Sequence, residues 1–197
     1  MSKMNYWLKS YWSVLSKPTK QTFITIAQES ENRFGEIIAW IEFAIILFFS
    51  PMIIFCGGPD CTNGMLVTSM VNIPIWFLIF VFSLHRINQL LSKSDEIYYE
   101  KLLFSSGTIF VVSVSILVLI ITIADIFQSN GEFAYLLIPP IIYWFVLTVI
   151  SVKAITSSSF FLAIINVTLS LVISLIGFVF VGWNFMYLLY NLPSYFN

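Results

Sequence analysis

The residues of this sequence that could carry out acid–base chemistry are few and far apart. Glu42 and Asp125 are carboxylates within apolar stretches, and His85 is the single histidine. An aspartyl-type site needs two carboxylates in contact, and a serine–histidine site needs a histidine that faces a serine. Measured from one membrane face, Glu42 would be roughly 8 Å deep and Asp125 roughly 27 Å deep, so they cannot meet. We therefore predict no catalytic residues and no enzyme activity.

Glu42 is nevertheless the residue with the clearest chemical potential. A carboxylate in hydrocarbon is costly and usually faces the interior of a helix bundle or water. It could form an intramembrane proton or cation site, with Asn72 and Asn166 as polar partners if their helices are adjacent. The alternative is structural: Glu42 is protonated, reaches the interface, or bonds to a neighbouring Ser or Tyr. Because the sequence has no Gly-rich phosphate loop and no Cys/His metal spacing, we predict no cofactor and no metal.

The composition is that of a membrane protein. Of the 197 residues, 59% are hydrophobic and only 10% are charged, whereas a soluble domain has about 25% charged residues. The mean hydropathy is +0.93. A net charge of −1 provides no basic field for nucleic acid. These values indicate an all-α membrane protein whose first partner is the lipid bilayer.

Five apolar stretches are long enough for helices that cross a bilayer of roughly 30 Å. We therefore expect a bundle of five transmembrane helices over residues 37–182. Residues 1–36 form a cytoplasmic or interfacial N-terminal arm, and residues 183–197 form an aromatic tail at the far interface. The predicted spans are 37–56, 65–84, 107–127, 135–155 and 160–182.

Two polar regions have the pattern of short amphipathic helices that lie at the membrane surface. The second loop, residues 85–106, contains Ile97, Tyr98, Leu102 and Leu103 among charged residues. In the N-terminal arm the apolar residues recur at helical spacing, which predicts a helix with its rings at the headgroup level. The alternative for the arm is a helix packed under the bundle. Its apolar residues are Trp7, Leu8, Tyr11, Trp12 and Leu15.

The basic residues predict the orientation of the chain in the membrane. All nine Lys and Arg residues precede span one or lie between spans two and three or four and five. The positive-inside rule then places the N-terminus in the cytoplasm and the C-terminus outside. The loop that joins Cys56 to Cys61 faces outward, where a disulfide between them can form. The alternative is two unpaired thiols.

Small residues follow one face of the fifth span. At helical spacing, such residues allow another helix to approach closely, so this face is a candidate helix-packing surface. Packing is favoured over a substrate path. The face consists of Ala163, Asn166, Ser170, Ser174 and Gly177.

Parts of the sequence resemble the Yip1 domain family. Residues 12–18 (WSVLSKP), followed by Thr22-Phe23 and Ile26-Ala27, are similar to the segment with which members often open before five spans. Trp144 and residues 158–163 are similar in spacing to the second half of the family. The resemblance implies a five-span fold. Eukaryotic members act in vesicle trafficking with Rab-type GTPases through a longer N-terminal region. The short arm here is more similar to bacterial members, which implies a bacterial plasma membrane.

These observations predict a non-catalytic membrane protein of Yip1-like type. We expect it to act as a membrane-embedded organising or interaction subunit that binds other membrane proteins or a second copy of itself. The alternative is a small transporter or channel component that uses Glu42 as a proton or cation site.

Overall fold

The computed structural model describes residues 4–29, 63–92, 99–126 and 134–195, and the regular structure within these ranges is entirely helical. The prediction of an all-α fold is therefore confirmed at this level. The helices are α1 (Met4–Ser16), α2 (Lys20–Glu29), α4 (Asn63–Ser92), α5 (Tyr99–Ile126), α6 (Ala134–Thr156) and α7 (Phe160–Tyr195).

Four of these helices are long and apolar enough to cross a membrane. Their apolar segments are Pro74–Leu91 in α4, Tyr99–Leu117 in α5, Ile138–Thr156 in α6 and Phe160–Val181 in α7. Length and composition thus indicate an integral membrane protein of the multi-pass kind. The first predicted span, residues 37–56, lies outside the described residues.

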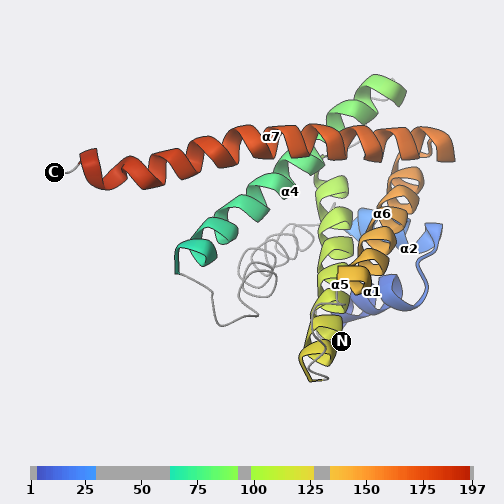
Figure 1. Ribbon diagram of the computed structural model, residues 1–197. Coiled ribbons are helices and arrows are strands. Elements are labelled where there is room, and N and C mark those ends of the chain that lie inside the picture. Colours follow the sequence, from blue (N-terminus) through green and yellow to red (C-terminus); the bar gives the residue numbers. More distant parts are fainter. Residues whose placement is uncertain (1–3, 30–62, 93–98, 127–133, 196–197) are drawn as a thin grey trace.

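The four long helices associate as two pairs. Helix α7 makes its most extensive contact with α4, and α5 makes its most extensive contact with α6. In Figure 1 the α5–α6 pair lies side by side, and the long α7 helix runs across it. The described helices therefore form two pairs that cross each other.

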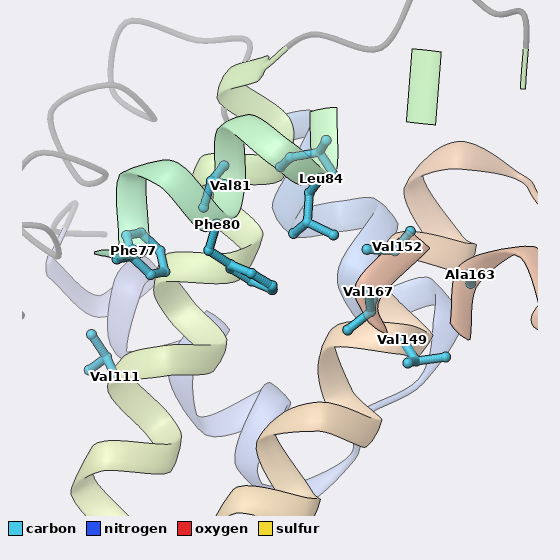
Figure 2. Packing of buried hydrophobic residues seen from close by; sticks show 10 residues of the cluster. Phe77, Phe80, Val81, Leu84, Val111, Val149, Val152, Ala163 and Val167 are labelled. Atoms are coloured by element: carbon cyan, nitrogen blue, oxygen red, sulfur yellow. The ribbon is translucent and has the colours of Figure 1, made fainter. Parts of the chain in front are cut away.

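A central cluster of buried apolar side chains holds the two pairs together. Each of the four long helices contributes to it, and Figure 2 shows its side chains converging from these elements. Because Phe80, Val81 and Leu84 are fully buried, this cluster removes a large apolar area from the surroundings. Its members are Phe77, Phe80, Val81, Leu84, Leu102, Val111, Val149, Val152, Ala163 and Val167.

A second cluster attaches the N-terminal helices to the α5–α6 pair. Val14 of α1 and Phe23 and Ile26 of α2 are buried there, with exposed fractions of 1% or less. Trp12, which the sequence places on the apolar face of α1, is instead 64% exposed. The N-terminal arm thus packs against other helices, and Trp12 points away from this contact.

The helix boundaries in the second loop differ from the sequence prediction. Helix α4 continues to Ser92 because its buried face extends through Ile87, which is only 8% exposed. Helix α5 already begins at Tyr99, and Leu102 in its first turns is buried in the central cluster. The separate surface helix predicted within residues 85–106 is therefore replaced by the ends of α4 and α5 in the described part of this loop. At the other end of the chain, α7 continues to Tyr195, beyond the predicted end of the fifth span at residue 182.

A three-residue turn joins α6 to α7. Ser157 has a positive φ of 52°, the left-handed conformation that often ends a helix. The Ser158 backbone N–H donates to Thr156 Oγ1 at 3.4 Å. Ser159 then caps α7, because its Oγ accepts a hydrogen bond from the backbone N–H of Leu162 at 3.3 Å. This turn sets the direction in which α7 leaves α6.

The conformation of Ser157 yields a test. Replacing Ser157 with Val should destabilise the protein by about 1–2 kcal/mol relative to Ser157→Gly, because a β-branched side chain is strained at positive φ. Ser157 is exposed, so neither change disturbs the core. The measurement is the midpoint of thermal unfolding in mild detergent. Equal midpoints for the Val and Gly variants would contradict the conformation of this turn.

Candidate functional site

The contact between α4 and α7 contains the small-residue face that the sequence indicates on the fifth span. Ala163, Ser170 and Ser174 are fully buried, and Asn166 is 2% exposed. Ala163 and Val167 belong to the central cluster together with four residues of α4. One face of α7 is thus enclosed by protein over at least three helical turns.

The hydroxyl groups on this face bond within α7 itself. Ser170 Oγ donates to the backbone oxygen of Asn166 at 2.7 Å and lies 3.3 Å from Asn166 Oδ1. Ser174 Oγ donates to the backbone oxygen of Leu171 at 2.9 Å. These serines therefore satisfy their polar groups locally and act at the contact through their small size.

At Gly177 the two helices α7 and α4 approach each other closely. A Cβ atom at position 177 would lie 3.2 Å from Ile79 Cγ2 and 3.4 Å from Ile79 Cδ1. The shorter of these distances is tighter than ordinary van der Waals contact. A residue larger than glycine at position 177 would therefore require the Ile79 side chain to shift by at least a few tenths of an ångström.

An aromatic group joins α4 to α5 and α6. The Trp76 ring is stacked on Phe80 at a centroid distance of 5.8 Å. It also lies 6.4 Å from Phe110 of α5 and 6.0 Å from Trp144 of α6. Aromatic pairs at these distances add to the stabilisation from buried area. The sequence shows abundant aromatic residues but not which of them meet, because the partners are on three different helices.

A buried hydrogen bond connects α5 to α6. Ser105 Oγ and Ser151 Oγ are 2.5 Å apart, and both residues are buried. Their separation of 46 positions in the chain gives no sequence signal for the pairing. In an apolar environment this bond matters because either hydroxyl alone would remain unsatisfied.

Other buried polar atoms have no hydrogen-bond partner, and they include Trp76 Nε1, His85 Nδ1 and Ser113 Oγ. The His85 ring packs edge-on against Tyr99 at 5.9 Å. Within the described residues, no group of three or more His, Cys, Asp or Glu side chains could hold a metal ion.

The predicted intramembrane polar site is only partly described. Glu42 lies outside the described residues, as does the side chain of Asn72. Ile79 of α4 and Gly177 of α7 lie in contact and serve as a reference point. Measured along the helix axes, Asn72 is about 10 Å from Ile79 towards the start of α4, and Asn166 is about 16 Å from Gly177 towards the start of α7. Because α4 and α7 run in opposite directions in Figure 1, these two positions are displaced to opposite sides of the contact. The structure thus does not bring positions 72 and 166 together.

The predicted disulfide cannot be placed on the fold, since Cys56 and Cys61 lie outside the described residues. No known family, no curated protein and no solved structure matches this chain. The resemblance to the Yip1 domain stays a prediction from the sequence.

The close approach at Gly177 predicts a size limit. Gly177→Leu should destabilise the protein by about 1–3 kcal/mol, because the added side chain overlaps Ile79 and forces α4 and α7 apart. Combining Gly177→Leu with Ile79→Ala should recover part of this loss. The measurement is unfolding by sodium dodecyl sulfate titrated into mild detergent. If Gly177→Leu alone leaves the stability unchanged, the result contradicts the close approach of α7 to Ile79.

The Ser105–Ser151 bond predicts energetic coupling between α5 and α6. In a double-mutant cycle with Ser105→Ala and Ser151→Ala, the coupling free energy should be about 1 kcal/mol, within the range measured for hydrogen bonds between membrane helices. The same unfolding titration provides the four stabilities. Additive effects of the two changes would show that the hydroxyls do not bond.

Proposed function

We propose that this protein is a non-catalytic integral membrane protein that acts as an organising or interaction subunit. One observation carries the proposal: α7 packs on α4 and α6, while much of its remaining surface is apolar and exposed. Only 22% of the residues in its segment Phe160–Val181 are buried. The exposed side chains in the middle of this segment include Leu169, Val172, Ile173, Leu175, Ile176 and Val179.

The chemistry of this outward surface of α7 supports contact with another membrane helix. Val172, Ile173, Ile176 and Val179 are β-branched, so their side chains are stiff and lose little conformational freedom when they pack. None of them carries a charge or a hydrogen-bonding group that would make the partner a polar solute. A large exposed apolar surface marks a region that lipid or another protein covers. We propose a second membrane protein, or a second copy of this chain, as the occupant of part of it.

The proposal includes the finer arrangement in the membrane. Residues 37–56 form a fifth span, the N-terminus is cytoplasmic, the C-terminus is extracytoplasmic, and the membrane is a bacterial plasma membrane. The distribution of Lys and Arg supports this orientation. The apolar segment Phe160–Val181 of α7 has 22 residues and is about 33 Å long, which is enough to cross a hydrocarbon core of roughly 30 Å.

Two further elements belong to the proposal. The architecture is of Yip1-like type, and the support for this is the spacing of the resembling segments together with the all-helical fold. Cys56 and Cys61 form a disulfide outside the membrane, for which the outward position of their loop provides the support.

Cross-linking from α7 tests the proposed role. A photoreactive benzoylphenylalanine at Ile176 should give a covalent product with a second polypeptide in intact membranes, because this side chain is 54% exposed on an apolar surface. Benzoylphenylalanine in place of Gln21, an exposed polar residue of α2, serves as the control. It should give a much weaker cross-linked product. The products are separated by electrophoresis and identified by mass spectrometry.

Benzoylphenylalanine is also placed at Val172 and at Val179, which lie on the same surface about one helical turn before and after Ile176. If none of the three α7 positions yields a product with another polypeptide, α7 is covered by lipid alone, and the interaction proposal is wrong.

A further inference from the structure

Two exposed basic side chains each lie over an exposed phenylalanine ring. The Arg86 guanidinium carbon is 5.2 Å from the ring centroid of Phe82 in α4. Lys153 Nζ, near the end of α6, is 5.5 Å from the ring centroid of Phe160, the first residue of α7. Phe82 is 50% exposed and Phe160 is 53% exposed, so both rings remain open to the surroundings.

Both pairs lie at the same end of the helix assembly. Each cation closely follows a buried residue of the central cluster. Arg86 comes two residues after Leu84, and Lys153 comes directly after Val152. Helices α4 and α6 both end on this side of the fold, where α7 begins, as Figure 1 shows. Arg86 and Lys153 thus each follow a residue of the central cluster in the second half of their helix.

This arrangement matches the boundary between the hydrocarbon and the headgroups of a bilayer. Long basic side chains place their stems along apolar surface and extend the charge towards water. An exposed phenylalanine beside the charge contacts acyl chains, while the cation reaches the phosphate above them. Arg86 Nη1 donates to Gln89 Oε1 at 3.3 Å, which occupies one of the five N–H donors of the guanidinium.

We propose that the Arg86–Phe82 and Lys153–Phe160 pairs bind the headgroups of anionic phospholipids, one at each pair. Charge selects the lipid class, since a cation near the surface attracts anionic lipids in preference to zwitterionic ones. The exposed ring beside each cation distinguishes a lipid from a free anion, because a soluble phosphate gains nothing from an apolar neighbour. The inference requires membrane embedding but is independent of the interaction role proposed for α7.

Lys153 also lies in the last turn of α6, where a cation interacts favourably with the helix dipole. That role alone would make Lys153→Gln slightly less stable without changing which lipids bind. Lipid selectivity therefore separates the proposal from a purely structural role.

The test is native mass spectrometry of the full chain in detergent, titrated with phosphatidylglycerol or with phosphatidylcholine of the same acyl chains. The unmodified protein should bind phosphatidylglycerol more tightly. Arg86→Gln and Lys153→Gln should each weaken phosphatidylglycerol binding by about fivefold, the contribution expected for one basic residue near an anionic surface. Phosphatidylcholine binding should not change. Arg86→Lys and Lys153→Arg keep the charge and should retain the selectivity.

Two controls make the result decisive. Lys20→Gln removes an exposed cation on α2 and should leave the selectivity unchanged. Excess inorganic phosphate should not displace the bound lipid. The proposal is overturned if the Arg86 and Lys153 variants bind like the unmodified protein, if Lys20→Gln has an equal effect, or if inorganic phosphate competes. Cross-linking from α7 should be the same in all of these variants, so failure here is distinguishable from failure of the interaction role.

Discussion

The close approach of α7 to α4 is the constraint on which the rest of the structure depends. Between membrane helices the surrounding lipid is as apolar as the side chains, so association relies on close packing. Gly177 against Ile79, with Ala163, Ser170 and Ser174 buried on the same face, provides that packing. Helix α7 also contacts α6, and its apolar residues Leu169, Ile173 and Ile176 remain exposed.

The remaining contacts extend from this pair. The central cluster places the α4–α7 pair on the α5–α6 pair, and the Trp76 rings add contacts to α5 and α6. The Ser105–Ser151 bond fixes α5 relative to α6, and α1 and α2 cover the other side of that seam. Several of the polar groups lie at helix contacts. The cations at the ends of α4 and α6 lie where lipid headgroups would meet the fold.

The sequence predicts the helical class and the presence of several helices apolar enough to cross a membrane, because long apolar runs reflect the thickness of the bilayer directly. It also indicates the small residues of α7, whose spacing marks a face before any partner is known. It does not predict where α4 ends and α5 begins. Residues 85–92 are largely polar, yet they continue α4 because Ile87 among them is buried. Nor does it predict that Trp12 points outward while Val14 is buried. The Ser105–Ser151 pair and the aromatic group around Trp76 depend on contacts between distant helices, for which a single sequence has no signal.

The central claim is that this protein works by holding other membrane proteins. The most direct measurement is the mass of the assembly released from its own membrane in polymer-bounded lipid discs, without prior exposure to detergent. The account predicts a defined complex in which this chain, at 22.6 kDa per copy, accompanies another polypeptide or further copies of itself. A chain released only as a monomer, which then moves a proton or cation across reconstituted liposomes, would contradict the account and favour transport.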